Sequence, residues 1–366
     1  MGGKEWSKIL LVQTSFLGDT VLTLPLIAEI KRRFPAAKLS LLCTPVGKEL
    51  LDGQPVLDEI IVDDKRRADK GWSGLWRKAR ALKAKGFALG LCPHKSFRSA
   101  LLLCLARIPH RVGFRQSKGW FLFNSLASRN ARKHDVERNL SILEALGIEL
   151  GDCHPAMELH VPSNTREAAR RLLAGLGVNT EKLIVGVNPG SVWPTKRWAA
   201  GSFSALIRLL KRDVECEVVL FGGPEDVPVA REIELQSSAR VVNVAGTIPL
   251  RMLPAVLAHC ALLITNDSGP MHIAVALGVP VVAIFCATTP ALGFYPYTSK
   301  AVVVEKNLSC RPCSGHGGRR CPLGTEDCIR LIAPERVLRA AQQLLQDVPA
   351  MSLADLAGRQ PRLVSA

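Results

Sequence analysis

The chain has 366 residues, more than one ordinary hydrophobic core serves, so we expect two α/β domains. Hydrophobic residues make up 48% and charged residues 22%, as in a soluble globular protein, and no apolar run has the length of a membrane span. Residues 1–9 lack the apolar region of a secretory signal, so we expect a cytoplasmic protein.

The net charge of +16 is concentrated in one stretch. Between Lys65 and Arg138 there are nineteen basic residues and three acidic ones, an excess equal to that of the whole chain. Such a block favours a polyanionic partner, which includes nucleic acid, an anionic membrane and a phosphorylated substrate. The alternative is a solvated basic face.

The first half alternates short apolar runs with helical patterns. Runs at 8–13, 38–43, 59–62 and 87–92 are typical of buried strands, and residues 21–34 and 71–85 have helical patterns. The helix at 71–85 is basic and carries tryptophans. Continuous apolar strands separated by helices predict a parallel sheet covered on both faces.

The same pattern restarts after residue 162. Strands are expected at 183–187, 217–221, 241–244, 261–265 and 279–285, with helices between them at 200–212, up to 231 and at 254–259. Two successive series of this kind predict two doubly wound domains, at 1–160 and 165–333, joined by a linker near 155–164. A C-terminal helix at 334–349 and a loose tail at 350–366 follow.

Two common nucleotide-binding motifs are missing. No strand is followed by G-x-G-x-x-G, which disfavours a nicotinamide enzyme, and no G-x-x-x-x-G-K-[ST] indicates a P-loop NTPase.

The first candidate loop, residues 14–20, directly follows the first strand, where ligands of a doubly wound sheet bind. Gly18 is expected to permit a tight turn. Asp19 is the only acid between Glu5 and Glu29, and it is a candidate general base. The alternative function of Asp19 is to cap a helix, whose start is delayed or kinked by Pro25.

The second loop, residues 187–198 (VNPGSVWPTKRW), follows the first strand of the second domain. Its glycine and serine allow close backbone approach, and its adjacent Lys196 and Arg197 supply positive charge. These groups are typical of a diphosphate site. The alternative is a basic surface loop between two tryptophans.

The third loop lies within residues 262–280 (LLITNDSGPMHIAVALGVP), where a strand ends and Pro270 takes the first helical position. The free amides of this helix start can hold a phosphate. In the alternative interpretation, Asp267 and Ser268 only cap the helix, and His272 is a histidine of the hydrophobic core.

These motifs together resemble a known family. LGDTVLTLP, PGSVWPTKRW, FGGPED at 221–226 and TNDSGPMHIAVALGVP are similar, in order and spacing, to glycosyltransferase family 9. These are the heptosyltransferases of lipopolysaccharide inner-core assembly, and the similarity is greatest to the heptosyltransferase II branch. It covers residues 8–346 and implies the GT-B fold, in which two Rossmann-like domains face a cleft.

The resemblance also implies a reaction. It is the inverting, metal-independent transfer of heptose from ADP-L-glycero-D-manno-heptose, bound by the C-terminal domain, to an acceptor bound by the N-terminal domain. Asp19 would deprotonate the acceptor hydroxyl, and Lys196 would neutralise the leaving diphosphate. The donor would contact Gly18, Ser191, Thr195, Glu225, Asp267, Ser268, Gly269 and His272.

The implied acceptor explains the basic block. Lipid A and its Kdo sugars carry phosphates and carboxylates, which arginine pairs well. Acceptor binding is expected at Lys95, Ser96, Arg98, Arg111 and Arg115. The block would also hold the enzyme, as a monomer, on the anionic inner face of the inner membrane, and we expect no nucleic-acid partner.

Four late cysteines, Cys310, Cys313, Cys321 and Cys328, offer thiols for structural zinc, although their spacing fits no standard finger. The alternatives are a reduced surface loop and a disulfide formed on oxidation. The family chemistry requires no cofactor.

Three other functions compete with this assignment. The first is a family member that uses another nucleotide sugar or acceptor. The second is a basic nucleic-acid-binding protein, which the sparse aromatic residues among the charges disfavour. The third is a noncatalytic paralogue, and the presence of Asp19, Lys196 and Asp267 disfavours it.

Overall fold

The computed structural model describes residues 6–151 and 155–346. The chain divides into two compact units. Unit 1 comprises Met1–His160 with Pro290–Tyr297, and unit 2 comprises Val161–Thr289 with Thr298–Ala366. The predicted tail at 350–366 and the last three residues of the predicted C-terminal helix lie outside the described residues.

Unit 1 is built on a six-stranded parallel sheet with the order β3-β2-β1-β4-β5-β6. Leu11 of the central strand pairs with Leu41 on one side and with Leu91 on the other. The chain reverses its direction of winding between β1 and β4, which is where doubly wound sheets bind ligands. The strands are β1 Lys8–Gln13, β2 Lys38–Cys43, β3 Glu59–Val62, β4 Leu89–Leu91, β5 His110–Phe114 and β6 Ser125–Ala127.

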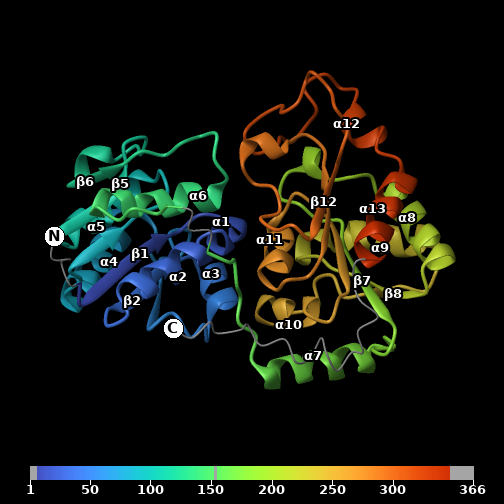
Figure 1. Cartoon of the computed structure of the whole chain (residues 1–366), viewed down its shortest axis with the longest axis horizontal. Helices are drawn as coiled ribbons and strands as arrows, with labels where there is room; N and C mark the ends of the chain where they lie inside the picture. The colour runs from blue at the N-terminus through green and yellow to red at the C-terminus, as the bar shows by residue number, and fades with distance from the viewer. Residues whose placement is uncertain (1–5, 152–154, 347–366) are drawn as a thin grey trace. The chain divides into compact units, whose positions relative to one another are not determined.

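The helices of unit 1 flank this sheet (Figure 1). The single helix predicted at 21–34 is two helices, because Pro25 lies in a first turn, where its missing amide hydrogen costs nothing. The elements are α1 Leu17–Val21, α2 Leu24–Arg33, α3 Pro45–Leu51, α4 Gly71–Lys85, α5 Phe97–Leu105, η1 Trp120–Leu122, α6 Asp135–Leu140 and η2 Ser141–Leu146.

The core of unit 1 shows how α4 is oriented. Leu75, Ala79 and Leu82 are spaced by four and three residues, so they share one helix face, and all three are buried. They pack in one cluster with Leu10 and Val12 of β1. The opposite face of α4 is therefore turned away from the core.

Unit 2 repeats the architecture of unit 1, with the order β12-β11-β10-β7-β8-β9. All its strands are parallel, and its first strand, β7, lies between β10 and β8 as β1 lies between β4 and β2. The predicted fold class, two doubly wound α/β sheets, is confirmed. The strands are β7 Leu183–Asn188, β8 Cys216–Leu220, β9 Val242–Asn243, β10 Leu262–Asn266, β11 Val281–Phe285 and β12 Ala301–Glu305.

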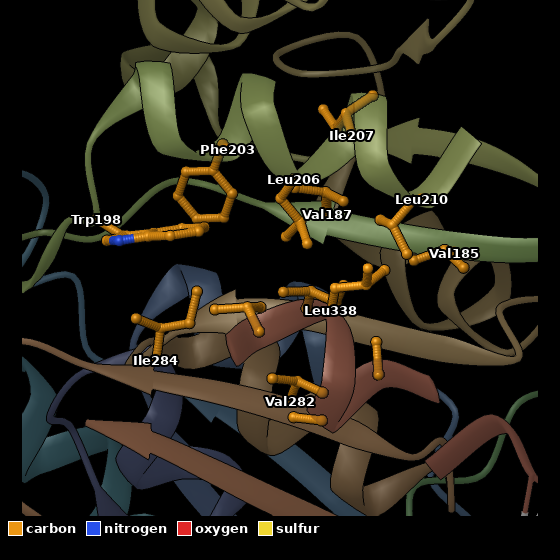
Figure 2. Packing of buried hydrophobic residues seen from close by; sticks show 14 of the residues in the cluster. Val185, Val187, Trp198, Phe203, Leu206, Ile207, Leu210, Val282, Ile284 and Leu338 are labelled. Atoms are coloured by element: carbon orange, nitrogen blue, oxygen red, sulfur yellow. The ribbon is translucent and has the colours of Figure 1, made fainter. Parts of the chain in front are cut away.

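The core of unit 2 lies between α8, α13 and the sheet (Figure 2). Phe203 of α8 meets Trp198 edge to face with ring centroids 4.9 Å apart. Leu338 of α13 belongs to the same buried cluster, so the C-terminal helix completes unit 2. The helices are α7 Ser163–Gly175, η3 Pro194–Lys196, α8 Ala200–Asp213, η4 Pro224–Asp226, α9 Val227–Ser237, η5 Leu250–Met252, α10 Leu253–Leu257, α11 Gly269–Ala276, α12 Asp327–Arg330 and α13 Pro334–Gln346.

Residues 290–297, which include η6 Pro290–Leu292, return to unit 1. The amide of Asp135 donates to the Gly293 carbonyl oxygen over 2.9 Å, and the His134 ring lies 2.9 Å from the carbonyl oxygen of Tyr295. Tyr297 stacks on His134 with ring centroids 4.6 Å apart. The chain therefore passes between the units three times. None of the helices within residues 6–151 and 155–346 has the length and apolar character that crossing a membrane requires.

Candidate active site

Two predicted loops of unit 2 meet at the carboxyl ends of neighbouring strands. β7 pairs with β10, and the Asn188 side chain at the end of β7 donates to the hydroxyls of Thr265 and Ser268, over 3.1 and 3.2 Å. The same amide also reaches the Gly190 carbonyl oxygen at 3.3 Å. Asn188 thus joins the second and third motifs, a function that the sequence reasoning did not assign to it.

A buried ion pair lies where these loops meet. Lys196 Nζ is 2.6 Å from Asp267 Oδ2, and the two side chains are only 14% and 6% exposed. The Thr288 hydroxyl donates to the same carboxylate oxygen over 2.7 Å. Thr288 follows β11, the strand on the other side of β10, and the sequence reasoning missed it although it is the third residue after a predicted strand.

The Cys310–Cys328 segment forms part of the support of Lys196. Gly318 donates its amide to the Thr195 hydroxyl over 2.7 Å, and Thr195 donates its amide to the Gly318 carbonyl oxygen over 3.2 Å. A Cβ at Gly317 would lie 2.8 Å from Lys196 Cγ, so glycine leaves room for the lysine stem. Thr195 is buried and holds this segment in place. Its predicted donor contact stays a prediction.

The N-terminus of α11 lies next to the ion pair in the chain. Ser268 is its N-cap residue but makes no side-chain capping bond, and Pro270 lies in the first turn. The buried Ser191 hydroxyl donates to the Asp267 carbonyl oxygen over 3.5 Å. A helix start with amides directed outward and a positive dipole end favours a phosphate. His272 is buried within α11, as the core-histidine alternative expects.

The loop before α9 is tied to the second motif through Asp226. Its carboxylate accepts the Gly223 amide at 3.0 Å and lies 3.7 Å from the Arg197 guanidinium, and burial raises its pKa. A Cβ at Gly190 would lie 2.2 Å from Asp226 Oδ2, so a larger residue there would displace the carboxylate. Sequence reasoning named Glu225, which is exposed on η4 and whose donor contact stays a prediction.

In unit 1, Asp19 is the third residue of α1. Its carboxylate accepts a hydrogen bond from the amide of Phe16, the N-cap residue, over 3.1 Å. Asp19 therefore does cap the helix, as the alternative interpretation expects. The side chain is half-buried. The tight turn predicted at Gly18 is wrong, because Gly18 lies within the first turn of α1, where it carries ordinary helical backbone.

Further polar groups line the same sheet edge of unit 1. Lys65, which follows β3, donates to the Thr14 carbonyl oxygen over 2.6 Å, and burial lowers the pKa of its amine. His94 follows β4, and burial lowers the pKa of its imidazole to about 4, so the ring is neutral at pH 7. The sequence reasoning singled out neither residue.

A family model described as glycosyltransferase family 9 (heptosyltransferase) matches residues 75–322, more than half of the chain. The chain belongs to glycosyltransferase family 9. The family membership, the GT-B fold and the glycosyltransferase activity expected from the motifs are therefore confirmed.

Relatives that match this family 9 enzyme over nearly their full length include members of the heptosyltransferase II branch, as the sequence motifs predicted. Lipopolysaccharide heptosyltransferase 2 of Salmonella typhimurium is 28% identical over 93% of this chain and 99% of its own. The crystal structure of a family 9 glycosyltransferase from Veillonella parvula superposes with a TM-score of 0.84 at 26% identity, covering 93% of this chain and 98% of the other. The structure of ADP-heptose LPS heptosyltransferase II of E. coli superposes with a TM-score of 0.76, also at 26% identity, and the match covers 93% of this chain and 99% of the other.

The predicted acceptor residues of the family 9 enzyme fall into two groups. Lys95 and Arg115 are exposed, and Ser96 caps α5 by accepting the Ser99 amide. Arg98 pairs with Asp63 at 2.9 Å, and Arg111 donates to two backbone carbonyl oxygens. Those two guanidinium groups already hold unit 1 together, and acceptor binding by the five residues stays a prediction.

The four late cysteines are free thiols, of which Cys328 is buried and the others half-buried. In the described part of the chain, no group of three or more His, Cys, Asp or Glu side chains has an arrangement that fits a metal ion. The observed arrangement matches the reduced-loop alternative, and structural zinc stays a prediction.

Proposed function

We propose that this family 9 enzyme transfers heptose from ADP-L-glycero-D-manno-heptose to the inner core of lipopolysaccharide, on Kdo or heptose carried by lipid A. The observation that carries the proposal is the buried Lys196–Asp267 pair beside the start of α11. The names of the full-length relatives, lipopolysaccharide heptosyltransferase 2 and ADP-heptose LPS heptosyltransferase II, support the choice of donor and acceptor.

On the donor side, the reaction needs a site for an anionic leaving group. Breaking the sugar–phosphate bond leaves ADP with additional negative charge. Lys196 and the amides at the start of α11 supply positive electrostatic potential there without a metal ion, and the amides, which the helix holds in place, need no reorganisation. Ser191 lies in the same loop as Lys196. Asp267, Ser268 and Gly269 position the donor sugar and its phosphates.

Asp267 has two functions in this scheme. In the ligand-free site it holds the lysine amine at 2.6 Å, and Thr288 holds the carboxylate. When the donor binds, the lysine amine turns toward the diphosphate, and the Asp267 carboxylate accepts hydrogen bonds from sugar hydroxyls. The Thr288 hydrogen bond keeps the carboxylate in place during this exchange.

On the acceptor side, Asp19 is the general base. It removes the proton of the attacking hydroxyl as the hydroxyl oxygen bonds to the anomeric carbon and the bond to the phosphate breaks. A single displacement opposite the leaving group inverts the anomeric centre. A positioned carboxylate typically contributes about 10²–10⁴-fold to such a step.

The basic block of unit 1 binds the phosphates and carboxylates of the acceptor, through residues that include Lys95 and Arg115. The same charge holds the enzyme, as a monomer, at the anionic inner face of the inner membrane.

The test is to incubate the enzyme with ADP-heptose and Kdo₂-lipid A, either bare or carrying one heptose, and to measure ADP release and product mass. We expect ADP release and a product heavier by one heptose, unchanged by a chelator. If ADP is released only from another nucleotide sugar, the enzyme uses a different donor. If a chelator abolishes turnover, the metal-independent mechanism is wrong.

A further inference from the structure

Unit 1 carries an unusual set of exposed aromatic side chains. Three of the six tryptophans of the chain are more than half exposed: Trp72 at 68%, Trp76 at 53% and Trp120 at 53%. Phe121 at 60% and Phe97 at 43% accompany them. We call these five residues the aromatic face. Single exposed apolar residues are ordinary, whereas a group of large aromatic ones marks an interaction surface.

The five residues lie on elements that contact one another. α4 packs against α5 (Figure 1), and α5 contacts η1. The Phe121 ring lies 6.3 Å from that of Phe97 and 6.0 Å from that of Trp120, measured between centroids. A Cβ at Gly119 would lie 2.7 Å from Ala100 Cβ, so a glycine lets η1 lie close against α5. Phe97, Trp120 and Phe121 are therefore one contiguous group, and Trp72 and Trp76 lie on the helix that packs against α5.

On α4 the exposed tryptophans are not leftover core residues. The core face is complete with Leu75, Ala79 and Leu82. Trp72 and Trp76 are four residues apart on the outer face, where a surface helix normally carries polar side chains. Their exposure costs solvation free energy in water, and the fold of unit 1 does not require it.

The surroundings of the aromatic face are basic. The sequence contains no acidic residue between Asp69 and Asp135, so α4, α5 and η1 are free of negative side chains. Arg80 and Lys83 are exposed on α4. Lys95 and Lys118 are also exposed, and their backbones are joined by a 3.3 Å hydrogen bond beside η1.

We infer that the aromatic face is a membrane-binding surface, which inserts its rings into the headgroup region of an anionic phospholipid bilayer while the neighbouring lysines and arginines pair with lipid phosphates. Tryptophan and phenylalanine next to cationic side chains match that interface, which is apolar on one side and anionic on the other. The inference rests on the proposed function in one respect, since a lipid-borne acceptor gives the enzyme reason to bind a bilayer.

Insertion differs measurably from electrostatic attraction alone. A purely electrostatic contact is screened at a Debye length of about 8 Å in physiological salt, whereas burial of aromatic surface is not screened. Binding that persists at physiological salt and depends on the rings is therefore the signature of the aromatic face.

The experiment uses the full chain and vesicles of phosphatidylethanolamine with phosphatidylglycerol, with phosphatidylcholine vesicles for comparison. The variant combines Trp72→Ala, Trp76→Ala and Phe121→Ala. The control combines Leu235→Ala and Leu323→Ala, which remove apolar side chains that are 74% and 64% exposed on unit 2.

We expect the wild type and the control to sediment with anionic vesicles at physiological salt, with a blue shift of tryptophan emission. The triple variant should bind at least about tenfold more weakly. Equal vesicle binding by the triple variant and the wild type would overturn the inference. So would a wild type that prefers single-stranded DNA to vesicles, or a triple variant whose main change is loss of self-association.

Activity separates this inference from the proposed function. On a deacylated, water-soluble acceptor the triple variant should turn over as fast as the wild type, and on acceptor embedded in vesicles it should be slower. If the triple variant is slow on the soluble acceptor, the rings belong to the acceptor site and the membrane inference is wrong. If the wild type transfers no heptose to either acceptor, the proposed function fails, while the vesicle measurements still decide the membrane inference.

Discussion

At the scale of single residues, the candidate active site depends on how Lys196 is held. A lysine amine on a flexible stem neutralises a leaving group efficiently only if its position is set beforehand. In the ligand-free site Asp267 holds the amine end and Thr288 holds the Asp267 carboxylate, while the segment at Gly317 supports the stem. Because an ion pair this buried brings little net stability, its presence supports the proposed donor binding more than a contribution to folding.

The support of the lysine stem gives a prediction for Gly317→Ala. Gly317 has φ +84, which L residues rarely adopt, and the new Cβ would lie 2.8 Å from Lys196 Cγ and 3.1 Å from Trp193 Cβ. We expect kcat/KM for the donor to fall by roughly 10–100-fold, since a misplacement of about 1 Å at a reacting group has effects of that size. Steady-state kinetics with ADP-heptose measures it.

Gly315→Ala is the matched control, because a Cβ there would meet no atom within 4 Å. It should leave kcat/KM unchanged, and both variants should keep their melting temperatures within a few degrees of wild type. Equal activity of the two variants would show that Gly317 does not position Lys196.

At the scale of elements, α2 contains a buried carboxylate whose charge supports the fold. Glu29 accepts hydrogen bonds from Arg32 and Arg33 at 2.7 to 2.8 Å, and these bonds, with Arg32 the largest cause, lower the pKa of Glu29 from 4.5 to about 2. A lowered carboxyl pKa stabilises the folded state above the unfolded pKa of 4.5, and this stabilisation is lost as the pH falls toward 2.

Glu29→Gln should therefore reduce the free energy of unfolding at pH 7. We expect a loss of about 2 kcal/mol, discounted for the solvent exposure of Arg32. Urea unfolding of both proteins between pH 7 and about pH 3 measures it, and the difference should shrink below pH 4.5. A difference that stays constant across this range would mean that the charge of Glu29 contributes nothing.

Sequence patterns predicted β1, β2, β3 and α4 with the bounds that the structure has. In β1 and β2 the signal is a continuous apolar run, which is typical of a strand covered on both faces. β6 has three residues at a sheet edge, too few for any periodicity. α5 is apolar almost throughout, and periodicity alone does not distinguish such a run from a strand.

The site was predictable as a set of loops, but the contacts within it were not. The rule that ligands bind after strands led to Asp19, Lys196 and Asp267. The partners Asn188 and Thr288 depend on β7 and β11 being the two neighbours of β10. A single sequence does not reveal that strand order, so these partners became visible only in three dimensions.

At the scale of the whole molecule, the chain repeats one strand order in two units and places the proposed groups in both. Asp19 belongs to unit 1, whereas Lys196 and Asp267 belong to unit 2. The return of 290–297 to unit 1 was not predicted, since it depends on contacts of Tyr295 and Tyr297 with His134, far away in the sequence. The separation allows base catalysis and donor binding to be tested independently.

The most direct test of this division is the variant Asp19→Asn, which keeps an oxygen to accept the Phe16 amide. ADP binding is measured by calorimetry, and heptose transfer by product mass. We expect ADP affinity like that of the wild type, because unit 2 is intact, and transfer slower by about 10²–10⁴-fold. Transfer at the wild-type rate, or loss of ADP binding, would mean that Asp19 is not a base that acts separately from donor binding.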